Sequence, residues 1–321
     1  MYIIALKRRR IFAIAITCIV GWICAYLATN VFRDYALGLF IWLPMVMGII
    51  TTLILGMNSP VSRQDLCYTS MGALGVFCVG MLGFAWEGII CLLMAAPIGL
   101  FFNFIGHRIG YYIIKNKRHK NIPTVCTLLF LSVPALMAFE NKVGYTEETR
   151  SVTTSIEINA PIEQVWSNII QFPKMEEPTE LIFKTGIAYP TSAQIDGRGV
   201  GAVRHCNFST GSFVEPITEW KEPTLLKFDV AEQPEPMKEL SLYDIHPNHL
   251  HGYWVSQKGE FKLTQLPNGH TLVEGTTWYI NRIRPDFYWT IWSDYIVHKI
   301  HQRVLEHIKK NSEKDVAQNN L

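Results

Sequence analysis

The apolar residues of this chain are concentrated in its first 140 positions, where several runs are long enough to cross a lipid bilayer. About 20 helical residues, at a rise of about 1.5 Å each, span the hydrocarbon core of a membrane. Residues 11–29 and 35–56 both meet this length. The chain of 321 residues is 49% hydrophobic, with a mean hydropathy of +0.15, which is high for a soluble protein. We therefore expect residues 1–140 to form a transmembrane region.

The apolar segment 69–105 is too long for one crossing, and Glu87 interrupts it near its middle. A hairpin of two helices, 69–85 and 88–106, fits this pattern, and a single span is the alternative. In the hairpin, Glu87 lies in the turn at the level of the lipid headgroups. This position is expected in preference to that of a functional carboxylate inside the membrane.

A fifth span is expected at residues 123–139, where Pro123 suits the first turn of a helix because its missing N–H needs no partner there. The rival interpretation of residues 11–29 is a cleaved signal peptide. It is disfavoured because further spans follow and no small-x-small cleavage site is evident. The sequence therefore predicts five transmembrane helices.

Basic residues set the expected orientation, because lysine and arginine in short loops resist translocation. The run Lys7 to Arg10 places the amino terminus in the cytoplasm. A second basic group belongs on the same side and comprises His107, Arg108, Lys115, Lys117, Arg118 and Lys120. Four spans between the two groups and a fifth after them put the C-terminal domain on the outer side. We expect an integral protein of a bacterial inner membrane, and a single span over 69–105 would leave the side of that domain open.

Charge and cysteine content exclude several classes of protein. The formal net charge is +2, with no long basic block beyond the two groups above, so nucleic acid is not an expected partner. Six of the seven cysteines lie in or beside the apolar runs, and Cys206 stands alone in the later half. No disulfide framework is possible in that half, and no CxxC pair offers thiolate ligands to zinc.

After a polar linker at residues 141–150, the hydrophobic pattern changes from long runs to alternation. Residues 151–159 alternate like a half-buried strand, and a helix with one apolar face follows from Pro161. A long helix closes the chain from about Asp286, with a stripe of apolar residues that recur nearly every four positions. Further strands are expected at 201–208, 213–220, 225–230, 252–256, 260–265 and 271–280.

Three stretches of this half resemble a known superfamily. "VTTSIEINAPIEQVWSNIIQFPKM", "GVGAVRHCNFSTGSFVEPITEW" and "HQRVLEHIKK" are similar to the opening, the first long hairpin and the closing helix of START-like, or SRPBCC, proteins, also described as polyketide cyclase/dehydrase and lipid transport. The resemblance implies an α+β helix-grip domain at 151–312, in which an antiparallel sheet wraps a long C-terminal helix and leaves a largely apolar cavity. A disordered tail is expected at 313–321. Residues 1–140 match no family that we recognise.

The resemblance also implies a set of residues that face the cavity, drawn from the inner faces of the strands and from the helix stripe. Large aromatic side chains around one space can bury a hydrophobic ligand. The alternative is that they fill the space themselves as an ordinary core. The candidate ligand-binding residues are Phe208, Phe213, Trp254, Phe261, Trp278, Ile280, Tyr288, Trp289, Trp292 and Ile296.

Few polar residues are placed to do chemistry. Asp294 and His298 stand four apart on the closing helix, where a carboxylate can fix the tautomer of an imidazole. Arg204 lies in a strand beside Glu215 in the next one, where a partly buried ion pair can form. Asp294, His298 and Arg204 are the catalytic candidates, although no nucleophile accompanies them and structural pairing is the expected role.

The stretch "HPNHLH" holds His246, His249 and His251 within six residues and raises the question of a metal site. It lacks the helical HExxH spacing that places two imidazoles on one face. Three histidines on a polar loop are more often a solvated edge than a ligand set. We therefore expect no metal there and no cofactor elsewhere.

The sequence thus favours a membrane protein that binds or transfers a hydrophobic molecule, such as a lipid or an isoprenoid, taken from the adjacent leaflet. An enzyme of the cyclase or lyase type that uses the same cavity is the first alternative. A sensory or assembly module with a filled core is the second. The sequence names no protein partner.

Overall fold

The computed structural model describes residues 2–57, 60–116, 121–241, 243–245 and 247–319. These residues form two compact units. The helical unit consists of Met1–Thr146, Glu239–His249 and Ile283–Tyr288, and the sheet domain consists of Glu147–Lys238, Leu250–Arg282 and Trp289–Leu321. Two short segments that the sequence assigns to the C-terminal domain therefore pack with the helices.

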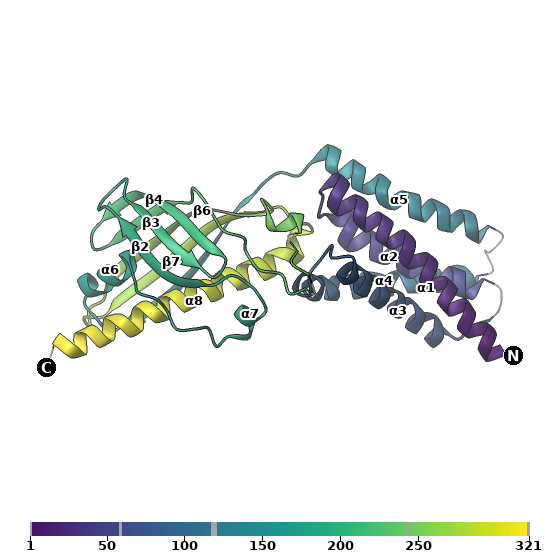
Figure 1. The fold of residues 1–321 in the computed structure, drawn as a ribbon, viewed down its shortest axis with the longest axis horizontal. Coiled ribbons are helices and arrows are strands. Elements are labelled where there is room, and N and C mark those ends of the chain that lie inside the picture. Colours follow the sequence, from purple (N-terminus) through teal and green to yellow (C-terminus); the bar gives the residue numbers. More distant parts are fainter. Residues whose placement is uncertain (1, 58–59, 117–120, 242, 246, 320–321) are drawn as a thin grey trace. The chain divides into compact units, whose positions relative to one another are not determined.

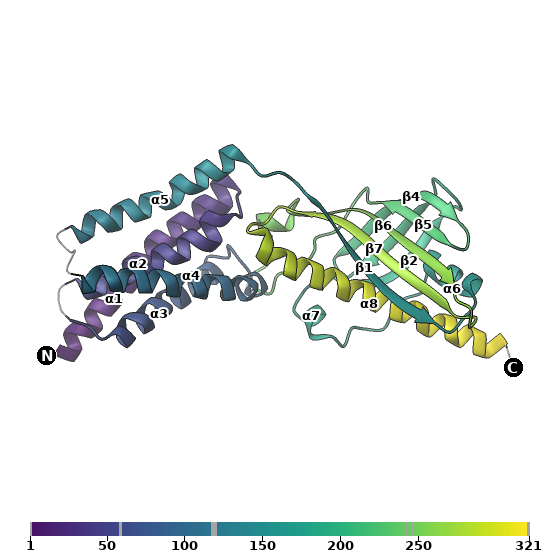
Figure 2. The same ribbon diagram turned by 180° about the vertical axis from the view of Figure 1, so that it is seen from behind.

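The helical unit is a bundle in which apolar helices pack side by side (Figure 2). Its elements are α1 (Tyr2–Tyr26), the π-helical η1 (Leu27–Phe32) and η2 (Gly38–Trp42), α2 (Leu43–Gly56), α3 (Arg63–Gly83), α4 (Ile89–Lys115) and α5 (Ile122–Val143). Within the described residues, five helices are long and apolar enough to cross a membrane. This supports the prediction that the protein is associated with a membrane.

Helix α2 lies at the centre of the bundle, with Val46, Met47, Ile50 and Leu53 fully buried. Several buried polar groups of the bundle are paired between helices, which suits a region that water does not reach. The hydroxyl of Ser70 donates to Asn103 Oδ1 over 2.8 Å, for example. The core is therefore apolar with a few hydrogen bonds that fix neighbouring helices against each other.

The structure divides the segment 69–105 into α3 and α4, joined by a turn at residues 84–88 that contains Glu87. It corrects the predicted basic loop, because His107 and Arg108 lie inside α4, which continues to Lys115. His107 is buried, and its Nδ1 lies 3.1 Å from the hydroxyl of Thr52. Lys117, Arg118 and Lys120 of the same group lie outside the described residues.

The sheet domain has the predicted helix-grip fold: a curved antiparallel sheet with α8 (Asp286–Asn319) along it (Figure 1). In the described part of the chain the sheet has seven strands, in the order β1-β7-β6-β5-β4-β3-β2. They are β1 (Thr149–Ile158), β2 (Pro190–Asp196), β3 (Val203–Phe208), β4 (Gly211–Lys221), β5 (Leu225–Asp229), β6 (Trp254–Gln265) and β7 (Thr271–Asn281). The remaining elements are α6 (Ile162–Ile170), α7 (Leu181–Lys184) and the 3₁₀ turn η3 (Asn248–Leu250).

Three features differ from the prediction. The predicted strands 252–256 and 260–265 are parts of one strand, β6, which begins only at Trp254 and stays paired with β7 through a register shift between Ser256 and Lys258. Strand β2 was not predicted, since it opens with a proline at the sheet edge and only its first residue and Ala193 are buried. The predicted disordered tail is instead helical as far as Asn319, and within it Asp315 accepts a hydrogen bond from Gln164 of α6.

Candidate ligand-binding site

The face of the sheet that lies against α8, here called the concave face, is identified by contacts between β7 and the helix. The hydroxyl of Tyr279 donates to Asp294, and the hydroxyl of Thr277 lies 2.7 Å from His301 Nε2. Because side chains alternate along a strand, the odd-numbered residues of β7 face the helix. Residues opposite them on neighbouring strands share this face.

Four of the predicted ligand-binding residues lie on the concave face. Trp254 pairs with Asn281 and packs against Tyr279, with ring centres 5.4 Å apart. Phe261 pairs with Gly275, whose missing side chain leaves room for the ring. Phe208 lies on β3 and Phe213 on β4, with their ring centres 4.8 Å apart. Neither ring is fully buried. These partly exposed rings form an apolar surface that a ligand can cover.

The structure corrects the facing of Trp278 and Ile280. Both lie on the face of β7 away from α8, and Lys258 Nζ stands 5.0 Å from the Trp278 ring centre. The sequence predicts the alternation of side chains along β7 but assigns the even-numbered residues to the face that lies against α8. The assignment is ambiguous because Trp278 and Tyr279 offer a large aromatic residue to each face. Tyr279, fully buried, is the residue that faces inward.

Two candidates of the helix stripe each lie one position away from a buried residue, whereas Trp289 is buried. Trp292 and Ile296 are only partly buried, whereas Ser293 and Val297 are buried against the sheet. Apolar residues alone predicted the stripe, but polar groups on α8 pair with the sheet: Asn281 Nδ2 donates to the Ser293 hydroxyl over 2.9 Å. Trp289 is buried in the sheet domain.

Tyr288 does not belong to the sheet domain. It falls in the segment Ile283–Tyr288 of the helical unit, and its hydroxyl donates to the carbonyl oxygen of Met94 in α4. The start of α8 therefore packs with the helical unit, and Tyr288 is not among the candidates that the concave face brings together.

Arg204 and Glu215 form an ion pair that is fully enclosed inside the sheet domain. They are directly opposite each other on β3 and β4, and the Arg204 guanidinium is surrounded by the rings of Phe172, Phe228 and Phe261, 5.7–5.8 Å from their centres. Burial raises the pKa of Glu215, against the lowering effect of the neighbouring guanidinium. The pair is structural, and Arg204 is not placed as an acid or base.

The predicted dyad of Asp294 and His298 is not formed. Asp294 accepts hydrogen bonds from Tyr279 and from Arg150, the latter over 2.9 Å. His298 Nδ1 instead lies 2.8 Å from the hydroxyl of Thr154 on β1. Each side chain of the pair therefore has its own partner on the sheet.

His301 was not among the predicted candidates, and it is the histidine that lies deepest between helix and sheet. Its Nδ1 is 3.1 Å from the hydroxyl of Thr154, and its Nε2 contacts Thr277. Burial, reinforced by the nearby His298, lowers the pKa of His301 to about 4. The imidazole is therefore neutral at physiological pH. Its spacing from Asp294 and His298 on one helix was the signal that could have placed it.

Acid is expected to destabilise the protein through His301. The pKa of His301 is about 6.5 in the unfolded chain and about 4 in the folded one. Below pH 6.5 the unfolded state therefore binds a proton that the folded state does not. The free energy of unfolding is unaffected above pH 6.5 and falls by up to about 3 kcal/mol as the pH falls toward 4. Thermal unfolding of the full chain in detergent should show that His301→Gln loses less stability between pH 7.5 and 4.5 than wild type does. His251→Gln serves as the exposed control, and equal pH profiles for all three proteins would contradict the prediction.

Of the histidines of "HPNHLH", the structure describes His249 and His251. His249 is buried in the helical unit, whereas His251 is exposed in the sheet domain, with its Nε2 3.5 Å from Glu235. His246 lies outside the described residues.

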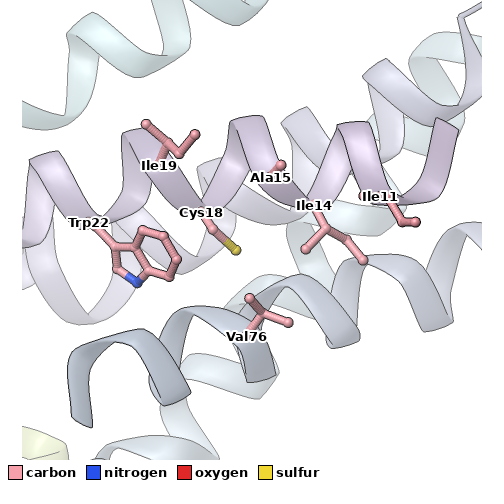
Figure 3. A pocket seen from close by; sticks show the side chains of 7 residues that line it. All are labelled: Ile11, Ile14, Ala15, Cys18, Ile19, Trp22 and Val76. Carbon is pink, nitrogen blue, oxygen red and sulfur yellow. The ribbon is translucent and has the colours of Figure 1, made fainter. Parts of the chain in front are cut away.

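A hollow of about 450 Å³ lies on the helical unit, lined only by apolar atoms of α1 and α3 (Figure 3). Ile11, Ile19 and Val76 at its rim are among the most exposed large side chains of their helices. The indole of Trp22, also in the wall, donates to the carbonyl oxygen of Phe77 over 3.0 Å, so no polar group faces the hollow unpaired. Such a surface suits contact with lipid chains. Its lining residues are Ile11, Ile14, Ala15, Cys18, Ile19, Trp22 and Val76.

Comparisons with known proteins bear on the sheet domain. A family model described as polyketide cyclase/dehydrase and lipid transport matches residues 149–284. No curated protein matches the chain.

Several solved structures are similar to about half of the chain. A protein from Nitrosospira multiformis shares 19% identity and covers 52% of this chain and 99% of its own, with a TM-score of 0.33. Norcoclaurine synthase from Thalictrum flavum shares 13% identity, over 54% of this chain and 99% of its own, with a TM-score of 0.34. Zhui aromatase/cyclase from Streptomyces sp. R1128 shares 12% sequence identity, and the match covers 53% of this chain and 96% of its own, with a TM-score of 0.33. The C-terminal half of this chain resembles the START-like, or SRPBCC, superfamily and matches the polyketide cyclase/dehydrase and lipid transport family over residues 149–284.

Proposed function

We propose that this protein binds a hydrophobic molecule, a lipid or an isoprenoid, on the concave face of its sheet domain and exchanges it with the membrane. The observation that carries the proposal is a combination within one chain. Residues 149–284 match a family whose description includes lipid transport, and five helices of the same chain have the length and hydropathy of membrane spans. A carrier tethered beside its source of ligand explains why these two parts are joined.

The concave face supports this proposal through its partly exposed aromatic side chains. Phe208, Phe213 and Trp254 each offer ring surface that the protein's own core does not cover completely. An acyl chain or isoprenoid that loses about 300 Å² of apolar surface to such a site gains on the order of 7 kcal/mol before the cost of ordering. Because micromolar binding corresponds to about 8 kcal/mol net, a ligand that binds this tightly must bury more apolar surface than this or add polar contacts.

The location of the domain is part of the proposal. Helix α5 ends at Val143 and β1 begins at Thr149, so the linker is short and keeps the domain near the bilayer. With the run Lys7 to Arg10 in the cytoplasm and five crossings, the sheet domain lies on the outer side. We place the protein in a bacterial inner membrane, where the ligand comes from the outer leaflet.

A cyclase- or lyase-type activity is a second candidate, and one observation favours it. His298 and His301 converge on the hydroxyl of Thr154, at 2.8 and 3.1 Å, inside the sheet domain. A buried neutral imidazole can take a proton from a substrate at neutral pH. Against it, the described side-chain partners of the two imidazoles are the threonine hydroxyls of Thr154 and Thr277, with no carboxylate among them to orient a base.

Native mass spectrometry of the full-length protein, followed by lipid extraction and identification, tests the first proposal. A lipid bound at about one molecule per chain, resistant to detergent exchange, is the expected result. A ligand-free mass, with no uptake when lipids are titrated, would contradict the carrier function and leave the second candidate in its place.

A further inference from the structure

Four reactive side chains, from two segments distant in sequence, meet at one end of α4 in the helical unit. Glu87 lies in the turn before α4, Cys91 in its first turns, and Glu239 and His249 at the two ends of the segment that packs against this turn. Glu87, Glu239 and His249 are each no more than 7% exposed. One donor atom from each of Glu87, Cys91 and His249 can be chosen so that all lie within 4.8 Å of one another.

The backbone holds this cluster at both ends of the segment. The N–H of Ile89 donates to the carbonyl of Leu240 over 2.9 Å, and the Asn248 side chain donates to the carbonyl of Thr29 over 2.8 Å. Gly88 favours this close approach, because a Cβ there would lie 2.8 Å from the Cβ of Glu239. The close approach is therefore built into the fold.

The two nitrogens of His249 face different groups. Nε2 lies 2.9 Å from the sulfur of Cys91 and 3.6 Å from Oε1 of Glu239, and the Cys91 thiol also donates to that oxygen. Nδ1 lies 3.4 Å from Oε2 of Glu87, whose other oxygen accepts a hydrogen bond from Tyr35 over 3.1 Å. One side of the ring thus faces a thiol and a carboxylate, and the other faces a carboxylate that is itself held in place.

The charges of the cluster favour a bound cation. The imidazole supplies one positive charge at most, against two enclosed carboxylates and an ionisable thiol. Ionised carboxylates that are removed from water cost several kcal/mol each unless a positive charge or hydrogen bonds compensate. Oε2 of Glu239 has no hydrogen-bond partner among the described residues, although its side chain is fully buried. A divalent ion would satisfy this oxygen and neutralise the thiolate and the carboxylate together.

We propose that Cys91, Glu239 and His249 bind a zinc ion, through Sγ, a carboxylate oxygen and Nε2, and that Glu87 with Tyr35 orients the imidazole from behind. Thiolate, imidazole and carboxylate are the ligands that zinc takes in proteins, and three of them leave a fourth position for water. A histidine that binds metal through one nitrogen commonly donates its other N–H to a carboxylate, which is the position of Glu87. Binding releases the thiol proton to solvent and changes no oxidation state.

The separations suit this assignment. Bonds of about 2.3 Å to sulfur and about 2.0 Å to nitrogen or oxygen place tetrahedral ligand atoms about 3.5 Å apart. His249 Nε2 lies 2.9 Å from the Cys91 sulfur and 3.6 Å from Glu239 Oε1, and the Cys91 sulfur lies 2.5 Å from the same oxygen, so the thiol must turn away from the carboxylate to admit the ion. The sequence predicts no metal bound by the three histidines of "HPNHLH" together. The site proposed here takes only His249 from that motif. Its other ligands are Cys91, 158 positions earlier, and Glu239, which precedes the motif.

Metal content and cobalt substitution of the full-length protein in detergent test the proposal. We expect about one zinc per chain, and after exchange for Co²⁺ an absorption band from sulfur-to-cobalt charge transfer. Cys91→Ser should abolish that band. Glu87→Gln, which leaves all three ligands in place, should weaken Zn²⁺ affinity by about 10- to 100-fold.

Two matched variants control for indirect effects. Cys67→Ser removes a partly buried thiol from α3, and His251→Gln removes the exposed neighbour of His249; both should keep the metal and the band. Gel filtration identifies variants that fail to fold. If Cys91→Ser is one of them, the Zn²⁺ affinity of Glu87→Gln tests the proposal in its place. The proposal is overturned if wild type takes up neither Zn²⁺ nor Co²⁺ at micromolar concentration, or if the cobalt band survives Cys91→Ser. It does not depend on lipid binding by the sheet domain.

Discussion

Replacing Gly106 by alanine is expected to force α4 away from α2 and to destabilise the helical unit by about 1–3 kcal/mol or more. A Cβ at this position would lie 2.0 Å from the carbonyl oxygen of Met45, a backbone atom that cannot move aside without shifting the helix. On the facing helix, a Cβ on Gly48 would lie 2.2 Å from the carbonyl oxygen of Asn103. The two glycines thus permit one close crossing, as small residues do between membrane helices.

Gly72→Ala is the matched control for this prediction. Gly72 lies within α3, and nothing lies within 4 Å of a Cβ built on it. Alanine should be neutral there or stabilise the helix by up to about 1 kcal/mol. Thermal unfolding in detergent, followed by circular dichroism, compares the two variants. Equal midpoints would show that α2 and α4 do not approach so closely.

Removing Arg204 should have the second large effect. Arg204→Met leaves Glu215 enclosed among aromatic rings without its cation, and breaking one partner of a buried ion pair costs about 3–5 kcal/mol. Glu215→Gln leaves an unpaired guanidinium, with a similar cost. The double variant Arg204→Met/Glu215→Leu should recover most of the loss, because an apolar pair of similar volume suits this core.

The pH dependence of Arg204→Met gives a further check on its cause. Burial already raises the pKa of Glu215, and Arg204 is the main group that opposes this rise. Without Arg204, the carboxyl of Glu215 binds its proton more tightly in the folded state than in the unfolded state. The free energy of unfolding therefore falls as the pH rises, and the variant is less stable at pH 8 than at pH 5. The exposed pair of Arg198 and Glu222 is the control: Arg198→Met should cost less than about 1 kcal/mol. Similar losses for the two arginine variants would contradict the buried pairing.

Much of the fold could be predicted from hydrophobic periodicity. Runs of about 20 apolar residues identify membrane helices, and alternation identifies most of the sheet. The buried residues of α6, among them Val165, Trp166 and Ile169, follow the predicted face. Strand β2 carried no such signal, since an edge strand that buries few side chains can be polar throughout.

The site was harder to predict than the fold, because it depends on which face a residue takes. Trp278 and Tyr279 are adjacent aromatics, and only tertiary contacts, such as that of Tyr279 with Asp294, show which one faces α8. Polar residues such as Ser293 and His301 lie on the buried stripe because sheet hydroxyls and amides satisfy them, which a pattern of apolar residues does not show.

The cluster of Glu87, Cys91, Glu239 and His249 could not be predicted, since its members come from segments that only the tertiary fold brings together. The sequence offered Glu87 in a turn and His249 in a histidine-rich loop as separate features. It also assigned residues 239–249 to the C-terminal domain, because no compositional change marks this segment as part of the helical unit.

The central claim, that the concave face binds a hydrophobic ligand, is tested most directly by two tryptophans on opposite faces of the sheet. Trp254 lies on the concave face and Trp278 on the other, and both are partly buried. Full-length wild type, Trp254→Ala and Trp278→Ala would be titrated with the fluorescent fatty acid cis-parinaric acid. Trp254→Ala should weaken binding by about tenfold, which corresponds to about 1.4 kcal/mol of lost contact, and Trp278→Ala should leave it within about twofold. Equal weakening in both variants, or no binding by wild type, would contradict the account.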